Sequence, residues 1–538
     1  MLSPAVMADP TPDPALQRGR NRRVALVGVA LALLYGLPSL AWPFGRDQAL
    51  YDYVARGWVD GWIPYVDSFD HKPPGFYAVY ALADLLFGRT QWGIRVLELA
   101  AVVGTGALAA VALGVRSSGE LRVNPGVGAL VASGFFYTTF DYWHTAQAEM
   151  WECLLLAGSW ALVARRDPAR GAAGTALAAG SLAGLAFMVK FPAGLVAVPL
   201  GLAWGWRRAR VGRGPSAVAW GALQVLLYGL GAAIPMVTLS LPFVATGAFA
   251  EMWTLTVDFN LVNASRRLIP VLVPPNFLAV HAPTYGVAAA VACIWWMRRG
   301  CRRRLAAVGV VLLVACATVV WQRRMYLYHY SILTLPLTAL LAGSISLRRS
   351  ARGSLALAAG LVALACAQQP QWFQAPGWSY ARQAASSLGR LTGATSRSAW
   401  LRPFVSRRGV RYRYADHEAL AAALGPLRRD GDTLCARGYE PTLYHLVDLR
   451  CTTRFSTTFA LTDSAMRYHR RAWKREYDET LERHPPTWVV TGKALEEDIQ
   501  ALEADGYTLV QRAGRLLLFG NAEVAARTPT PEDGARGR

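Results

Sequence analysis

Residues 24–43 read VALVGVALALLYGLPSLAWP, and this apolar stretch decides the fold class of the chain. One helical crossing of a bilayer needs about 20 consecutive, mostly apolar residues. Further runs of this kind lie at 92–114, 126–143, 147–164, 172–189, 191–206, 216–245, 281–297, 305–322, 330–347 and 353–370. We therefore predict a polytopic α-helical membrane protein with about eleven transmembrane helices.

The composition agrees with this class. Of the 538 residues, 53% are hydrophobic and only 17% are charged, which excludes a set of soluble domains. A net charge of +21 would suggest a nucleic-acid partner in a soluble protein. Here the basic residues stand in short clusters between apolar runs, so the charge indicates topology and we expect no nucleic acid as a partner.

Arginine clusters occupy every second connection between the runs. Because basic residues collect on the cytoplasmic side, they predict a cytoplasmic tail at 1–23 and an odd number of crossings, with everything after residue 370 outside. The expected location is the cytoplasmic (inner) membrane, with the C-terminal part periplasmic in a Gram-negative cell. The clusters are Arg18/Arg20/Arg22/Arg23, Arg116/Arg122, Arg165/Arg166/Arg170, Arg207/Arg208/Arg210/Arg213, Arg298/Arg299/Arg302/Arg303/Arg304 and Arg348/Arg349/Arg352.

The same rule settles two ambiguous stretches. Residues 75–88 are apolar but short, and counting them as a crossing would put every later arginine cluster outside, so we expect them in the interface. Residues 172–206 have arginine clusters at both ends, which requires a hairpin that turns near 190–192. Lys190 is then expected at or just below the outer surface.

Residues 371–521 show the patterning of a small extracytoplasmic α/β domain. We expect strands at 432–436, 488–491, 507–511 and 515–519, and helices at 440–446 and 495–504. Residues 522–538 have no apolar period and are expected to be disordered. Cys435 and Cys451 share this domain, which leaves either a disulfide, our prediction, or two buried thiols.

The first outer loop, residues 44–91, carries the most specific pattern. Residues 45–95 read GRDQALYDYVARGWVDGWIPYVDSFDHKPPGFYAVYALADLLFGRTQWGIR. The pattern consists of Asp47, Tyr51, Ala55, a Gly-x-x-Pro-Tyr-x-Asp turn at 61–67, Lys72-Pro73-Pro74, Phe87-Gly88 and Arg95. It resembles the first external loop of GT-C membrane glycosyltransferases related to protein O-mannosyltransferases and the lipid A aminoarabinose transferase (glycosyltransferase family 39).

The resemblance extends more loosely over the whole body, residues 24–370. His144 to Met150 are similar to the family's second acidic element and contain Glu149. Arg323 and Arg324, followed by His329 and Tyr330, are similar to the stretch that faces the lipid phosphate. The resemblance implies an enzyme that transfers a sugar from a polyprenyl-phosphate donor to a lipid, glycan or protein acceptor on the outer face.

The chemistry of such a transfer assigns roles to these residues. An acceptor hydroxyl is a poor nucleophile and needs a carboxylate to take its proton, for which Asp47 is the candidate and Glu149 the second. The leaving phosphate needs cations, for which Lys72 is the strongest candidate. The remaining phosphate candidates are Arg323, Arg324, His329 and Tyr330, and the remaining loop candidates are Tyr51, Asp70 and His71.

Two departures from the family pattern bear on a metal. Gln48 stands where a second carboxylate is common, and His71 stands where the aminoarabinose transferases place a Glu. No cofactor is certain, and a divalent metal held by Asp47 and Glu149 is left open.

The alternative function is a transporter or flippase of lipid-linked saccharides. It is disfavoured because the carboxylates cluster outside and the two halves show no repeat. The sequence contains no G-x-x-x-x-G-K-[ST] loop, which an ATP-driven pump would need, and no G-x-G-x-x-G, which is typical of a nucleotide-binding domain for nucleotide sugars. Taken singly, Asp47 is also compatible with a solvated loop carboxylate, and Lys72 with a lysine that snorkels at the interface.

Overall fold

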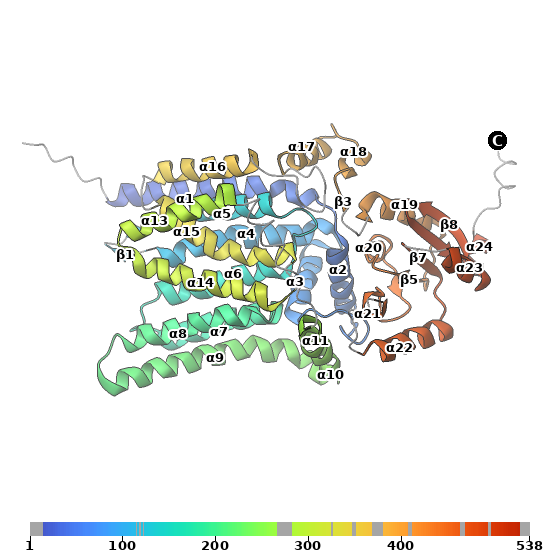
Figure 1. Ribbon diagram of the computed structural model, residues 1–538, viewed down its shortest axis with the longest axis horizontal. Coiled ribbons are helices and arrows are strands. Elements are labelled where there is room, and N and C mark those ends of the chain that lie inside the picture. The colour runs from blue at the N-terminus through green and yellow to red at the C-terminus, as the bar shows by residue number, and fades with distance from the viewer. Residues whose placement is uncertain are drawn as a thin grey trace, which may run out of the picture.

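The structure is a computed structural model in which a helical bundle carries a smaller domain at one end (Figure 1). It describes residues 14–114, 116–117, 120–121, 123–265, 282–323, 326–346, 351–367, 380–406, 412–462, 469–492 and 496–527.

Each predicted apolar run coincides with a helix. The long helices of the bundle are α1 (Pro14–Gly36), α4 (Gln91–Leu113), α5 (Pro125–Thr139), α6 (Ala148–Arg165), α7 (Ala172–Val189), α8 (Ala193–Ala209), α9 (Gly214–Ala245), α13 (Val287–Arg298), α14 (Arg302–Trp321), α15 (Thr334–Ser346) and α16 (Ala351–Ala367). Among the described residues, five helices are long and apolar enough to cross a membrane by themselves, in α1, α4, α7, α9 and α14. The chain is therefore a polytopic membrane protein, and the count of eleven crossings stays a prediction.

Helix α1 begins ten residues before the predicted run, so part of the N-terminal tail at 1–23 is helical. A search for apolar runs leaves out the basic residues of this tail. They can still form a helix, because arginine and glutamine are good helix formers.

Close helix packing depends on small residues. Helix α4 lies against α5, α6 and α15, and α7 lies against α9. Gly180 and Gly184, one turn apart on α7, face the backbone of α9, and a Cβ on either would collide with the carbonyl oxygen of Tyr228 or Ala232. Such small-residue contacts let two helices approach closely within a bilayer, where lipid offers little hydrophobic driving force for association.

The two ends of the bundle differ. The last turn of α8, with Arg207 and Arg208, and the connection from α8 to α9, with Arg210 and Arg213, lie at the end far from the smaller domain (Figure 1). At the near end, short helices α2 (Arg46–Val59), α3 (Pro74–Phe87), α10 (Phe249–Trp253) and α11 (Phe259–Ser265) lie between bundle and domain (Figure 1). The predicted interfacial stretch 75–88 is thus a separate short helix, and the predicted hairpin turns where α7 ends at Val189 and α8 begins at Ala193.

The C-terminal domain is built on a five-stranded mixed sheet with strand order β6-β5-β7-β9-β8. Its strands are β5 (Thr433–Arg437), β6 (Arg450–Cys451), β7 (Trp488–Thr491), β8 (Thr508–Ala513) and β9 (Leu516–Gly520). Strand β5 pairs in parallel with β6 and β7, whereas β9 pairs antiparallel with β7 and β8. All of β7 is buried, as expected for a central strand.

The remaining elements complete the architecture. The domain helices are α17 (Tyr380–Leu391), α18 (Arg397–Leu401), α19 (Tyr414–Leu424), α20 (Thr442–Val447), α21 (Phe459–Thr462), α22 (Arg470–Arg483), α23 (Glu496–Ala504) and α24 (Ala522–Arg527). Two small hairpins pair β1 (Arg116–Ser117) with β2 (Glu120–Leu121), and β3 (Val405–Ser406) with β4 (Tyr412–Arg413). The predicted strands and helices of the domain all coincide with observed elements.

Two predictions about the domain are wrong. Residues 522–527 form helix α24 and are not disordered, because Arg527 bonds to the buried Asp432 at 2.7 Å; residues 528–538 lie outside the described residues. Cys435 and Cys451 are free and buried, not bridged. Cys451 lies opposite Leu434 in the parallel pair, so Cys435, one residue further along β5, points to the other face of the sheet.

Candidate active site

The N-terminus of α2 sets the position of Asp47. The helix starts after Gly45, whose extended backbone turns the chain out of the bundle, and Asp47 stands in its first turn, where a helix favours a negative charge. Gln48 is fully buried and donates from Nε2 to the carbonyls of Tyr142, at 3.0 Å, and Thr145, at 2.7 Å. Gln48 therefore fastens α2 to the loop between α5 and α6.

Lys72 is fixed through its backbone. Its carbonyl accepts a hydrogen bond from the Tyr65 hydroxyl at 2.8 Å, and its N–H donates to the Tyr77 hydroxyl at 3.3 Å. Pro73 caps α3 in an extended conformation and Pro74 occupies the first turn, a position where the missing N–H costs nothing. The sequence Lys-Pro-Pro thus places a buried lysine immediately before a helix.

The ammonium of Lys72 lies among aromatic rings and a second lysine. It is 5.5 Å from the ring centre of Tyr51 and 5.8 Å from that of Tyr328. Lys190, in the turn between α7 and α8, lies 5.8 Å from the same Tyr328 ring. Burial, followed by the charge of Lys190, lowers the pKa of Lys72. Two cations that share one ring in a buried place form a natural site for an anion.

Carboxylates balance this charge from the first turns of α6. Glu149 forms an ion pair with Lys190, and His329 of the 3-10 segment η4 (Leu327–Leu333) lies 4.0 Å from the same carboxylate. Glu152, one turn further along α6, is buried and feels the charges of both lysines. Glu149 Oε2 and Glu152 Oε1 are buried acceptors without a hydrogen bond from any described residue.

Asp47 is a partly exposed carboxylate with two different oxygens. Its Oδ1 accepts a hydrogen bond from Tyr439 at 2.9 Å, whereas the amide of Gln147 lies 3.5 Å from Oδ2. Burial raises the pKa of Asp47, while the charge of Lys72 and the Tyr439 bond oppose that shift. A carboxylate with a raised pKa is a stronger proton acceptor than an ordinary loop aspartate.

Asp70 and His71 support this arrangement from the loop. The Asp70 carboxylate accepts from the Tyr77 hydroxyl at 2.6 Å and lies 3.0 Å from His71 Nδ1. Burial alone would raise the pKa of Asp70, but His71, the Tyr77 bond and Lys72 hold it below its usual range. Asp70 therefore remains ionised and tethers the tyrosine that holds Lys72.

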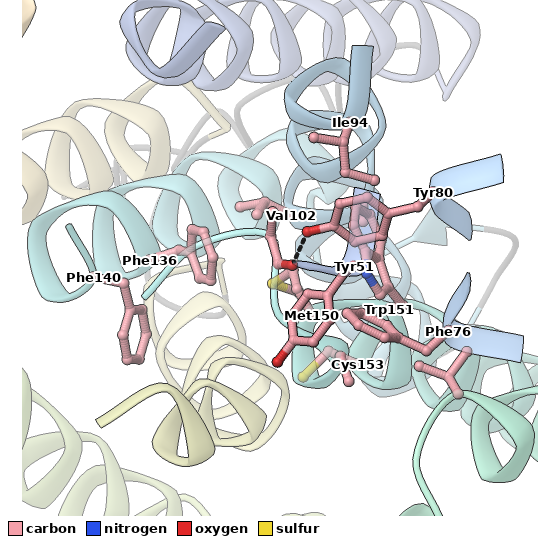
Figure 2. Close-up of a cluster of buried hydrophobic side chains, with 14 of the residues drawn as sticks. Tyr51, Phe76, Tyr80, Ile94, Val102, Phe136, Phe140, Met150, Trp151 and Cys153 are labelled. Atoms are coloured by element: carbon pink, nitrogen blue, oxygen red, sulfur yellow. Dashed lines mark hydrogen bonds between the residues drawn. The ribbon is translucent and has the colours of Figure 1, made fainter. Parts of the chain in front are cut away.

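An aromatic cluster lies beneath these charges. The ring of Tyr51 meets Phe76 edge-on at 4.7 Å and Tyr80 at 5.9 Å. Figure 2 shows these rings packed with Met150 and Trp151 of α6, and the dashed line from Tyr80 marks its bond to the carbonyl of Ala146, at 2.8 Å. The bond joins α3 to the start of α6 and keeps the lysine and carboxylate elements in register.

The structure thus brings together most of the predicted site residues. Asp47, Tyr51, Lys72, Glu149 and His329 belong to one connected group. Tyr330 is buried on the same 3-10 segment as His329. Arg323 is exposed after the last turn of α14, and Arg324 lies outside the described residues.

Several members of this group escaped the sequence analysis. Lys190 was expected only at or just below the outer surface, and Tyr328, Glu152 and Tyr439 were not among the predicted site residues. One signal could have found Lys190: it and Lys72 are the only lysines among residues 1–370, where all other basic residues except histidines are arginines. A lysine among so many arginines indicates a position that uses a compact point charge instead of a planar guanidinium.

The residues do not fit a metal site. Glu149 is already neutralised by Lys190, and both oxygens of Asp47 face hydrogen-bond donors. Among the described residues, no three His, Cys, Asp or Glu side chains group as metal ligands would. We therefore route no chemical step through a metal.

Comparison with known proteins identifies the fold. No model of a protein family matches the sequence, and no curated protein matches it. The crystal structure of ArnT from Cupriavidus metallidurans bound to undecaprenyl phosphate is similar over 96% of this chain and 100% of that one, with a TM-score of 0.54 and 15% identity. The apo structure of the same protein covers 94% of this chain and 98% of its own, with a TM-score of 0.54 and 17% identity. The GT-C resemblance expected from the sequence is confirmed at the level of the fold.

Proposed function

We propose that this protein is a membrane glycosyltransferase that moves a sugar from a polyprenyl-phosphate donor to an acceptor hydroxyl. The observation that carries the proposal is a carboxylate, Asp47, that feels the charge of the buried Lys72, whose ammonium shares the ring of Tyr328 with a second buried lysine, Lys190. The group lies at the end of the bundle that carries the C-terminal domain. By the positive-inside rule, that end faces out of the cytoplasm.

The proposed reaction assigns a role to each of these residues. Asp47 takes the proton of the acceptor hydroxyl while the oxygen of that hydroxyl forms a bond to the anomeric carbon of the donor sugar. The bond from that carbon to the phosphate oxygen breaks, and the electron pair leaves with the polyprenyl phosphate. Lys72 and Lys190 stabilise the charge that develops on the phosphate. The hydrogen-bond acceptors without donors on Glu149 and Glu152 suit the hydroxyls of a sugar.

The relative with this fold supports the choice of donor, because ArnT was crystallised with undecaprenyl phosphate. A lipid phosphate needs its charge bound at the membrane surface and its chain left in apolar surroundings. The lysines stand at the mouth of an apolar bundle, which meets both needs. The acceptor can be a lipid, a glycan or a protein.

The test is sugar transfer by the purified protein from labelled polyprenyl-phosphate sugars, with the lipid products resolved. Asp47→Asn keeps the size of the side chain but cannot take a proton, so we expect a loss of roughly 10²–10⁴-fold. Activity within about threefold of wild type would remove Asp47 from the mechanism and make Glu149 the next candidate. Movement of the intact donor across a vesicle membrane, without transfer, would favour a flippase. The same assay with EDTA tests for a divalent metal.

The matched control is Asp60→Asn. Asp60 ends the same helix and pairs with Arg89 at the surface, where an ion pair contributes little. Asp52, a closer neighbour, is unsuitable, because it is buried against Arg56 at 2.8 Å and His445 at 2.7 Å. Its replacement would take the nearest carboxylate from the buried Arg56 and destabilise the loop.

A further inference from the structure

Two consecutive residues of the C-terminal domain contact two consecutive residues of α2. The Tyr439 hydroxyl donates to Asp47 Oδ1 at 2.9 Å, and Glu440 accepts from the Arg46 guanidinium at 2.5 Å. These pairs are separated by more than 390 residues of chain. The candidate base is therefore bound by a domain that lies outside the helical bundle.

The turn that presents Tyr439 is held firmly. It follows β5, and Gly438 adopts φ +121°, a value that side-chain-bearing residues rarely reach. Thr458 closes the turn twice: its N–H donates to the Gly438 carbonyl at 2.8 Å, and its hydroxyl accepts from the Gly438 N–H at 2.9 Å. The Tyr439 ring packs edge-on against Phe459 at 5.6 Å. The hydroxyl is thus aimed by the domain core.

The Arg46–Glu440 contact is a buried clamp. Arg46 and Glu440 are both more than nine-tenths buried, and Glu440 also bonds to His417 at 3.0 Å and Arg515 at 3.0 Å. Burial would raise the pKa of Glu440, but His417, Arg46 and Arg515 together hold it below its usual range. Separation of the domain from α2 would take from Arg46 the carboxylate with which it pairs, so the contact ties the domain to the bundle.

We propose that Tyr439 is a positioning residue that binds Oδ1 of Asp47 and leaves Oδ2 as the oxygen that accepts the acceptor proton. This inference rests on the proposed function. A hydrogen bond to one carboxylate oxygen fixes the rotation of the carboxylate and directs the other oxygen to the acceptor. The Gln147 amide donates to Oδ2 only at 3.5 Å, the outer limit of a hydrogen bond, so an acceptor hydroxyl can displace it. The C-terminal domain thereby completes the active site.

Tyr439 is suited to donate at every working pH. Burial and the charge of Asp47 hold its pKa well above the usual range, so the hydroxyl keeps its proton. The other titratable groups near Asp47 are Lys72, Asp70, Tyr51 and Tyr80. Of these, Lys72 favours the ionised carboxylate, as Tyr439 does, and Asp70 opposes it. Loss of the Tyr439 bond therefore raises the pKa of Asp47.

The test is Tyr439→Phe, which removes only the hydroxyl. We expect kcat to fall about tenfold on the acidic limb of the pH–rate profile, because a carboxylate that has lost the Tyr439 bond is protonated over more of that range. The acidic limb of the pH–rate profile should move up by about one unit, and activity should recover toward wild type as the pH rises. The KM for the donor should change little, because Tyr439 does not contact the lysines. A uniform loss at all pH values, or none, would overturn the inference.

The matched control is Tyr477→Phe, which removes a buried hydroxyl of the same domain that contacts Cys435 and not Asp47. Its pH profile should keep the wild-type midpoint. An infrared titration of the Asp47 carboxyl, identified as the band missing in Asp47→Asn, reads the same shift without any transfer. A wild-type protein that transfers no sugar would refute the proposed function, whereas an Asp47 band that titrates identically in wild type and Tyr439→Phe would refute this inference alone.

Discussion

The buried pair of Glu149 and Lys190 offers a test of how the charges of the site are balanced. Lys190→Met and Glu149→Gln each remove one charge while they keep the side-chain volume. Both side chains are at least nine-tenths buried, so neither charge can turn to water when its partner is lost. The double variant removes both charges together.

The magnitudes follow from the neighbours of each residue. Lys190→Met leaves Glu149 with His329, 4.0 Å away, and with the charge of Lys72, and it also removes a cation that acts on Glu152. Loss of one partner from a buried pair costs on the order of 3–5 kcal/mol. Glu149→Gln leaves Lys190 beside Glu152 and the Tyr328 ring, so we expect a smaller cost of about 1–3 kcal/mol. The double variant should be more stable than Lys190→Met alone, because replacing a whole buried pair is often close to neutral.

The assay is a double-mutant cycle on unfolding of the purified protein in detergent. The control cycle is Lys474→Met with Asp478→Asn, an exposed pair on α22 at 2.7 Å, whose coupling should stay below about 0.5 kcal/mol. If the Glu149 and Lys190 variants add within about 0.5 kcal/mol, the two charges do not stabilise each other and the reasoning is refuted.

Two further predictions concern the donor and the topology. Lys72→Ala should lower transfer about 10- to 100-fold, and Lys72→Arg should lower it much less. Either cation can face a phosphate, whereas alanine leaves the phosphate charge uncompensated. Equal transfer by wild type and Lys72→Ala, at equal expression, would mark Lys72 as a mere interface lysine. In intact cells, a thiol reagent that cannot cross the membrane should not label Arg210→Cys. It should label Arg483→Cys, which lies on the exposed face of α22. Labelling of Arg210→Cys from outside would contradict the N-in, C-out arrangement.

Local patterning explains why most of the fold could be predicted. The apolar runs coincide with helices because a spanning segment must satisfy all its backbone hydrogen bonds internally, which only a helix of that length does in one segment. The separation of α3 from the long helices could be predicted from charge, since counting residues 75–88 as a crossing would have placed every later arginine cluster outside. Strand β7 matches its predicted bounds because the apolar run after Pro485 and Pro486 is too short for a helix and has the length of a buried strand.

The disulfide prediction failed for a reason that also limits the site prediction. Two cysteines in one compartment need a shared face of the sheet, and that face depends on a register that the sequence does not reveal. Asp47 and Lys72 could be recognised because their loop has a dense, local motif. Tyr439 could not, because its only distinguishing feature is a contact made nearly 400 residues away.

Lysine and arginine have different roles in the membrane part of this chain, because their surroundings differ. An arginine cluster in a connection has a role fixed by the membrane, so its position in the sequence is enough to interpret it. Lys190 stands in a turn between two apolar helices, where position alone predicts a solvated surface charge. In the fold that turn closes over α6, and Lys190 becomes a buried cation between Glu149 and the ring of Tyr328. Burial makes the charge costly unless it is paired, and the neighbouring carboxylates of Glu149 and Glu152 each have one buried oxygen without a hydrogen bond from a described residue. A charge kept under those conditions, beside a second lysine and a candidate base, is better explained by a ligand that needs it than by stability, to which buried ion pairs contribute little.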